Sequence, residues 1–237
     1  MGGGTNSYTE IEETDVILLW GSNARETHPI FFHHLLKGVY NGARLFAIDP
    51  RRTSSARWAD TWVGLDVGTD IVVANAMGRE IIAQGWHHQK FIGHATTGFE
   101  AYRQSVEPFT LAEAERLSGV PGQVIHDMAK AYATARRAMI CWTLGITEHH
   151  NGVDNVSSLI NLALLTGHVG RYASGLNPLR GQNNVQGGGD MGALPDRFPG
   201  FQHVEVEANR LKFEQAWNTK LPPKRGWNLT GMLNAMG

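Results

Sequence analysis

Cysteine is almost absent from this chain of 237 residues, which contains a single one, Cys141. One cysteine cannot form a disulfide within the chain, and no CxxC spacing exists that could hold an iron–sulfur cluster by thiolates. Cys141 lies in the apolar run Ala138–Leu144, so we expect it to be a small buried hydrophobic residue. Because disulfides are excluded, the sequence fits a reducing compartment, and we expect a cytoplasmic protein.

Long apolar runs and an excess of one charge are missing as well. No stretch approaches the ~20 apolar residues that span a bilayer. The start, Met1-Gly2-Gly3-Gly4, lacks the basic and apolar segments of a signal peptide. Charged residues make up 18% of the chain and the formal net charge is -1, which gives no electrostatic basis for binding nucleic acid or an anionic membrane. We therefore expect no nucleic-acid partner and no membrane contact, and the scattered histidines predict no metal site.

Short apolar runs alternate with amphipathic segments through most of the chain. The runs predict four strands, over Asp15–Trp20, Arg44–Ile48, Thr61–Val63 and Ala138–Leu144. Helices are predicted from Thr27 as N-cap, from Asp70, from Pro121 and from Asn151 or Asp154, with several short helices over Trp86–Ser118. This alternation predicts an α/β fold, a three-layer Rossmann-like domain with a mostly parallel sheet.

The composition changes after Arg180. Residues 1–180 are predicted to form the Rossmann-like domain. Residues 181–237 are predicted to be the start of a second, truncated domain or a tail packed on the first. Within them, Gln186–Gly192 and Ala208–Trp217 favour short helices, and Leu221–Lys224 reads as extended.

Polar sequences follow each predicted strand, and three of the four contain glycine. They are Gly21-Ser22-Asn23 after the first, Asp49-Pro50-Arg51 directly after Ile48, Gly68-Thr69-Asp70 after the third, and the turn at Gly145. Parallel strands bring these loops to one edge of the sheet, where ligands bind in such folds. There Gly21 would permit close approach of a pyrophosphate, and Asp49 would suit a ribose or a base edge. For Asp70 a role as a helix cap is an equal alternative. The first turn is not GxGxxG, so this is not a standard NAD site.

One stretch, Gly175–Gly192, combines an arginine, five side-chain amides and six glycines with few apolar residues. The amides offer paired donors and acceptors, and the Arg180 guanidinium matches a carboxylate or a phosphate. Gln182, Asn183 and Asn184 follow it closely. The alternative is a flexible glycine-rich linker, but linkers favour serine over these amides. The composition favours a ligand-binding loop.

This stretch contains the motif Arg180-Gly181-Gln182-Asn183-Asn184-Val185-Gln186-Gly187, which is followed by Asp190-Met191-Gly192. The motif resembles the formate dehydrogenase branch of the molybdopterin oxidoreductases. The resemblance extends over nearly the whole chain, from about Thr5 to Trp217. It implies an oxidoreductase that converts formate to carbon dioxide at a bis-molybdopterin guanine dinucleotide with molybdenum or tungsten. Electrons would pass to a [4Fe-4S] cluster held by other parts of the subunit, and then to electron-transfer subunits with iron–sulfur or flavin centres.

The resemblance also implies roles for residues. Arg180 would lie beside the metal and face the formate carboxylate. Three segments would contact the guanine nucleotide: Trp20-Gly21-Ser22-Asn23, Ile48-Asp49-Pro50-Arg51 and Gly68-Thr69-Asp70. The Leu144-Gly145 turn and Gln182-Asn183-Asn184 would line the pterin or metal side.

Some features of that family are missing from this sequence. The metal-ligand cysteine or selenocysteine, followed by histidine, is expected upstream of Met1, and Cys141 is not at the matching position. We therefore expect an internal fragment of a longer catalytic subunit, inactive by itself. The alternatives are a non-catalytic relative, such as the large iron–sulfur subunit of NADH dehydrogenases, a simple nucleotide-binding module, or an α/β domain whose loops only turn corners.

Overall fold

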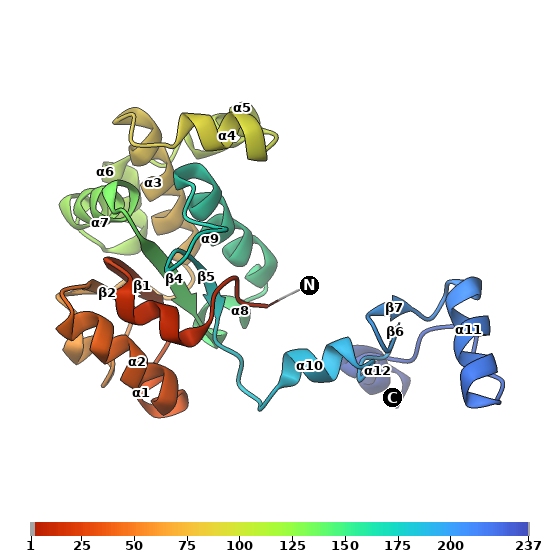
Figure 1. Ribbon diagram of the computed structural model, residues 1–237. Helices are drawn as coiled ribbons and strands as arrows, with labels where there is room; N and C mark the ends of the chain where they lie inside the picture. Colours follow the sequence, from red (N-terminus) through yellow and green to blue (C-terminus); the bar gives the residue numbers. More distant parts are fainter. Residues whose placement is uncertain (1–2, 237) are drawn as a thin grey trace. The chain divides into compact units, whose positions relative to one another are not determined.

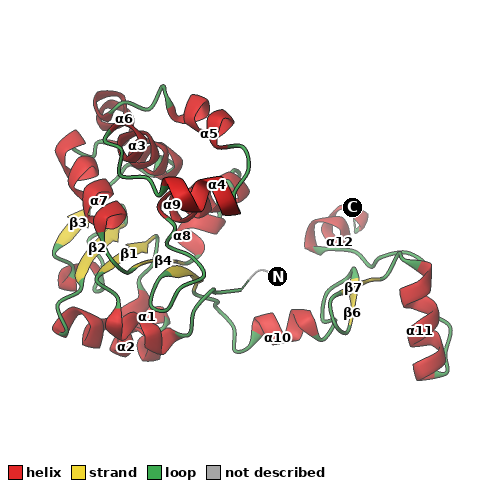
Figure 2. Ribbon diagram, turned by 45° about the horizontal axis from the view of Figure 1, so that its top comes forward, coloured by secondary structure: helices red, strands yellow, loops and turns green. Residues whose placement is uncertain are grey.

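The computed structural model describes residues 3–236 and divides into two compact units, one from Gly3 to Leu179 (unit 1) and one that begins at Arg180 (unit 2). Unit 1 contains a central sheet with helices on both of its faces (Figures 1 and 2). Within residues 3–236, no helix has both the length and the hydrophobicity to cross a bilayer.

The sheet of unit 1 has five parallel strands in the order β3-β2-β1-β4-β5. They are β1 (Val16–Trp20), β2 (Arg44–Ile48), β3 (Thr61–Val63), β4 (Ala138–Trp142) and β5 (Gly175–Pro178). The predicted three-layer α/β fold with a mostly parallel sheet is confirmed. The prediction for β4 is two residues too long, because Leu144 opens a short helix. Strand β5 is not predicted from the sequence and begins the stretch expected to be a loop, because glycine, asparagine and proline are poor strand formers.

Helices cover both faces of the sheet. On one face lie η1 (Tyr8–Glu13), α1 (Ala24–Thr27) and α2 (Pro29–Tyr40), and on the other α3 (Asp70–Ala83), α7 (Gly122–Thr134) and α9 (Gly152–Thr166). Beyond or between them are η2 (Ala56–Trp58), α4 (Gln89–Ala95), α5 (Phe99–Val106), α6 (Leu111–Ser118) and α8 (Leu144–Thr147). Alternate residues of β1 pack against opposite layers: Ile17 and Leu19 join the core under α2, and Leu18 and Trp20 the core under α3. Both faces of the sheet are thus buried, as expected for parallel strands.

The prediction that Thr27 caps the helix before Asn41 is wrong. Thr27 ends the short helix α1, and His28 is the N-cap residue of α2. The Thr27 hydroxyl donates to the Asn23 carbonyl (3.2 Å) within the first turn. Pro29 lacks an N–H to continue α1, so a second helix begins there.

The segment before η1 covers the exposed edge of the sheet. The Thr5 N–H donates to the Leu176 carbonyl (2.9 Å), and the Leu176 N–H donates to the Thr5 hydroxyl (2.9 Å). Glu10 accepts a hydrogen bond from the Ala173 N–H (2.9 Å). These contacts satisfy backbone groups of β5 that an edge strand would leave open.

Unit 2 has little regular structure and a small core. Its elements are α10 (Val185–Asp190), β6 (Arg197–Phe198), β7 (Gln202–His203), α11 (Glu207–Trp217) and α12 (Leu229–Ala235). β6 and β7 form an antiparallel pair. Phe198, Val204 and Phe213 are buried together, with Leu221 against them. Helices α10 and α11 lie close to the predicted ranges, whereas the two-residue strands and α12 are not predicted from the sequence.

Candidate functional site

The loops after β1 and β4 meet at the carboxyl edge of the sheet, where the strand order reverses. The Gly145 N–H donates to the Gly21 carbonyl (3.2 Å), and so does the Thr143 hydroxyl (2.6 Å). A Cβ at Gly145 would lie 2.6 Å from the Gly21 Cα, and one at Gly21 would lie 2.7 Å from the Gly145 carbonyl carbon. Gly21 also has a φ of +54°. Neither position accepts a side chain, so bare backbone lies where doubly wound sheets bind ligands.

The loop after β2 is fastened to the loop after β1. The Gly21 N–H donates to the Ile48 carbonyl (2.8 Å). The side-chain oxygen of Asn23 accepts hydrogen bonds from the hydroxyls of Ser54 and Ser55, each 3.0 Å long. The Asn23 side chain therefore links the two loops. Ile48 is fully buried and contributes to the same link only through its backbone carbonyl.

Asp49 presents a carboxylate at the end of β2. Its Oδ1 accepts a hydrogen bond from the Arg51 N–H (2.8 Å), and its carbonyl accepts one from the Trp62 indole (2.8 Å). The Asp49 residue is only 7% exposed, whereas Pro50 and Arg51 are exposed. This turn holds the carboxylate at the sheet edge and directs the arginine to the surface of unit 1.

Asp70, the first residue of α3, is also buried. Its Oδ1 accepts a hydrogen bond from the Trp20 indole (2.7 Å). Burial raises the pKa of the Asp70 carboxyl. The bond from Trp20 and the charge of His149 oppose this shift, and the charge of Asp49 adds to it. The pKa of the Asp70 carboxyl thus depends on Trp20 at the end of β1, on Asp49 after β2 and on His149 after β4.

The turn before α3 is formed by Gly68 and Thr69. Thr69 is the N-cap residue of this helix, so Asp70 does not serve as its cap. Gly68 has a φ of +88°, and a Cβ there would meet nothing within 4 Å. The glycine therefore forms the turn, and the space beside it is open.

Two buried polar atoms at the same edge have no hydrogen-bond partner among the residues that the structure describes. They are the Ser22 hydroxyl and the Trp142 indole nitrogen, in residues that are each 4% exposed. Burying an unpaired polar group costs about 1–3 kcal/mol. Both groups are hydrogen-bond donors, and an acceptor oxygen is the partner that each lacks. Trp142 is not among the residues predicted for the site; it ends β4 and pairs in register with Trp20.

The structure thus brings Gly21, Ser22, Asp49, Asp70 and Gly145 to one edge of unit 1. The loop that follows β5 carries Arg180, Gln182, Asn183 and Asn184 and is part of unit 2. Its residues 180–184 are exposed. There Asn184 adopts a left-handed conformation (φ 49°) as the N-cap residue of α10. The Asn184 amide lies over Gly187, where a Cβ would be 2.5 Å from the amide nitrogen.

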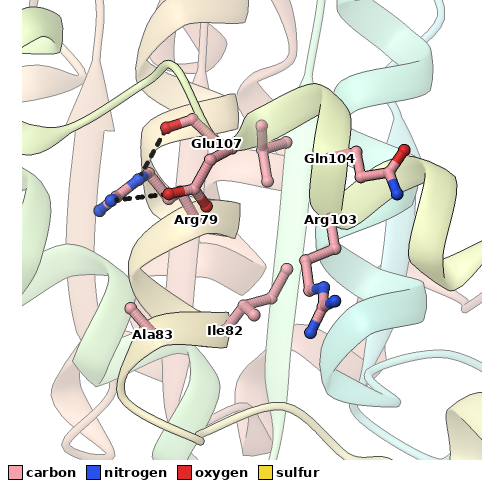
Figure 3. A pocket seen from close by; sticks show the side chains of 7 residues that line it. Arg79, Ile82, Ala83, Arg103, Gln104 and Glu107 are labelled. Atoms are coloured by element: carbon pink, nitrogen blue, oxygen red, sulfur yellow. Dashed lines mark hydrogen bonds and ion pairs between the residues drawn. The ribbon is translucent and has the colours of Figure 1, made fainter.

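A cavity of about 400 Å³ lies elsewhere in unit 1, between α3 and α5 (Figure 3). Arg79 donates to the carbonyl and the carboxylate of Glu107 (2.9 and 3.3 Å), and Ile82 lies beside them. These α3 residues are in the second half of the helix that Asp70 begins, more than two turns away from it. No predicted site residue lines this cavity.

Among residues 3–236, no group of three or more histidine, cysteine, aspartate and glutamate side chains is arranged to hold a metal ion. Cys141 is buried in β4, as predicted, and burial raises the pKa of its thiol to about 12. Such a thiol is protonated at neutral pH, as expected for a small buried hydrophobic residue.

Comparison with known proteins identifies the family. The family model described as molybdopterin oxidoreductase matches residues 3–234. Formate dehydrogenase H of Escherichia coli is 42% identical over 230 residues, which cover 97% of this chain and 32% of that protein. The alpha subunit of a formate dehydrogenase from Methanocaldococcus jannaschii is 41% identical over 236 residues, 100% of this chain and 35% of that protein.

The chain therefore spans about a third of the length of these relatives. Among solved structures, acetylene hydratase from Pelobacter acetylenicus is similar, with a TM-score of 0.65 and 22% sequence identity. The similarity covers 72% of this chain and 25% of that chain. At this identity the likeness supports the fold alone.

Proposed function

Because this chain belongs to the molybdopterin oxidoreductase family, we propose that it is part of the catalytic subunit of a formate dehydrogenase. The complete subunit would oxidise formate to carbon dioxide at a molybdenum or tungsten centre carried by a bis-molybdopterin guanine dinucleotide. The observation that supports this proposal is that relatives named as formate dehydrogenases match 97% and 100% of the chain at 42% and 41% identity.

The carboxyl edge of unit 1 fits the nucleotide end of such a cofactor. The backbone at Gly21 and Gly145 is bare, so a pyrophosphate can approach it closely. The Ser22 hydroxyl is a buried donor without a protein partner, and phosphate oxygens would accept from it. The carboxylates of Asp49 and Asp70 accept hydrogen bonds, which suits the ring and amino N–H groups of guanine and the ribose hydroxyls.

The other predicted residues would have supporting roles. Asn23 and Ile48 brace the loops after β1 and β2, and Pro50 shapes the turn that carries Arg51. In this proposal Arg51 contributes a positive charge near the nucleotide, and Gly68 leaves room beside it. Gln182, Asn183 and Asn184 would contact the pterin or metal side through their amides.

Arg180 would hold the substrate. When bound, the metal–pterin group supplies an acceptor for the two electrons that leave formate. A guanidinium can bind both oxygens of formate through two parallel N–H···O bonds and so fix the direction of its C–H bond. Lysine offers a single ammonium without this fork, so it cannot orient the carboxylate in the same way.

The electrons would leave through a [4Fe-4S] cluster in the rest of the subunit and then through subunits with iron–sulfur or flavin centres. The residues of this chain supply no cluster ligands in this scheme, because the one cysteine is buried with a raised pKa. A cytoplasmic location for the complete subunit is part of the same proposal.

The test uses the complete polypeptide that contains this chain, loaded with cofactor. We expect bound molybdenum or tungsten, guanine nucleotide, and reduction of a viologen dye that depends on formate. Arg180→Lys should lower kcat/KM for formate on the order of 100-fold because the two-point contact is lost. Arg225→Lys, an exposed arginine of unit 2, is the matched control and should keep wild-type kinetics.

Two results would contradict the proposal. Unchanged formate kinetics in Arg180→Lys would remove the role of this residue. A complete polypeptide without metal and without guanine nucleotide would instead favour a non-catalytic relative or a simple nucleotide-binding module. We also expect the 237-residue chain to be inactive by itself, so formate-dependent dye reduction by the purified chain would contradict its assignment as a fragment.

A further inference from the structure

Helix α12 of unit 2 carries an apolar stripe that is open to solvent. Leu229, Met232, Leu233 and Met236 recur at the spacing that places side chains on one side of a helix. They are 70%, 44%, 60% and 82% exposed, and no residue of the helix is buried. Trp227, just before the helix, is 64% exposed. An exposed apolar cluster of this kind marks a surface that binds another surface.

The helix is too short to persist in water without a partner. It has seven residues, whereas isolated helices shorter than about 12 residues are marginal even with favourable sequences. Gly231 lies inside it and lowers its helix propensity further. The Asn228 side chain caps it by accepting a hydrogen bond from the Gly231 N–H (2.8 Å), and one cap does not hold so short a helix by itself. Burial of the stripe is the remaining source of stability.

The core of unit 2 does not provide that burial. It consists of Phe198, Val204 and Phe213, with Leu221 against them, and none of these residues belongs to α12. A core of this size is smaller than independent domains require. The relatives, by contrast, are about three times as long as this chain, so two thirds of such a polypeptide is available to complete unit 2.

We propose that α12 docks by this stripe into an apolar, uncharged groove formed by the part of the same polypeptide that lies outside this sequence. The inference rests on the proposed function, in which the chain is one piece of a longer subunit. Residues 226–236 contain no charged side chain, a composition typical of permanent interfaces rather than transient ones. Covalent connection also gives a high effective concentration, which suits so small a helix.

Hydrogen exchange in the complete polypeptide tests the docking. We expect the backbone amides of residues 229–236 to be protected, and Leu233→Glu to accelerate their exchange on the order of 100-fold because a charge cannot enter the groove. Asn234→Glu adds the same charge at the neighbouring, non-stripe position and should leave the exchange unchanged. Peptides that contain Val16–Trp20 report whether the rest of the protein is folded. If Leu233→Glu fails to fold, Leu233→Ser removes the same contact without a charge.

Three outcomes would overturn the proposal: no protection in the wild-type protein, equal exchange in the Leu233 and Asn234 variants, or protection that disappears on dilution. The last would assign the stripe to a second copy of the chain. Formate oxidation and nucleotide content measured on the same samples separate the two proposals. If both persist while α12 is unprotected, the docking is wrong and the proposed function stands.

Discussion

The two units of this chain differ in how completely they bury their own apolar residues. In unit 1 the central residues of the sheet, such as Leu18 and Phe46, have no exposed surface, and helices cover both faces. In unit 2 the buried cluster is three residues, and Trp217 and Trp227 are 49% and 64% exposed. Unit 1 therefore has the packing of a self-sufficient domain, whereas unit 2 has that of a domain that needs further chain.

The difference in packing between the two units also affects the two parts of the proposed site. The loops at the carboxyl edge of unit 1 are bonded to one another and to a buried sheet, so their geometry exists before any ligand binds. Polar groups that are already ordered lose little conformational entropy when a ligand binds. The loop that carries Arg180 belongs to the unit with the smaller core. We infer that the nucleotide end of the site is pre-formed and that the substrate end depends on the rest of the subunit.

The largest expected contrast is between core truncations in the two units. Leu18→Ala removes a fully buried side chain of β1 and should lower the free energy of unfolding of unit 1 by about 4 kcal/mol. Phe213→Ala removes a ring that packs on Phe198 and Trp217, so it should leave the unit 1 transition in place. Urea unfolding followed by circular dichroism measures both. Equal shifts in the main transition would mean that the difference between the units has no energetic consequence.

A pH titration should expose the buried network of unit 1. His168 accepts a hydrogen bond from Arg171 at Nδ1 (2.9 Å) and contacts the Tyr132 carbonyl through Nε2 (2.9 Å). Burial lowers the pKa of His168 from 6.5 to about 4. Between these values the unfolded state binds the extra proton, so stability should be complete above pH 6.5 and fall as the pH drops to 4. The loss should total about 3 kcal/mol.

The control for that titration is His168→Gln. This variant should be less stable at pH 8 but should lose the part of the pH dependence that lies between pH 6.5 and 4. Unit 2 contains no buried histidine among its described residues, so its stability should not show this pH dependence. A variant with the wild-type slope would show that another group titrates.

The contact between Gly21 and Gly145 is the next test. Gly145→Ala would place a methyl 2.6 Å from the Gly21 Cα, so backbone must move, at a cost of about 2 kcal/mol. Gly93→Ala in α4 is the matched control, because a Cβ there meets nothing within 4 Å; it should stabilise the helix by about 0.5 kcal/mol. Thermal unfolding compares the two. Equal effects would mean that the two loops do not need their close approach.

The smallest expected effect comes from helix caps. Thr110 accepts a hydrogen bond from the Glu113 N–H (3.1 Å) at the start of α6, as Asn228 does in α12. Thr110→Ala should cost unit 1 about 1 kcal/mol. Asn228→Ala should speed hydrogen exchange in α12 and leave the unfolding of unit 1 unchanged. If the two substitutions shift global unfolding equally, α12 is part of the main folding unit.

The sequence predicts much of unit 1 because its strands are apolar runs buried on both faces, each followed by polar residues. Gly21, Asp49 and Gly145 were recognisable for that reason. It misses β5, whose Gly175–Pro178 sequence forms a strand only because β4 is beside it. It also does not predict that the Trp142 indole nitrogen lacks a hydrogen-bond partner, because an aromatic residue in an apolar run indicates only a buried core position. Tertiary contacts decide both cases.

The most direct test of the nucleotide site is the guanine nucleotide content of the complete, cofactor-loaded polypeptide with Asp70→Asn. The amide oxygen can still accept from the Trp20 indole, so the fold should remain, but the carboxylate that would bind guanine N–H groups is gone. Asp66→Asn, an exposed aspartate in the same turn, is the control. We predict that Asp70→Asn loses most of its bound nucleotide while Asp66→Asn keeps it. Wild-type nucleotide content in a folded Asp70→Asn protein would contradict the proposed site.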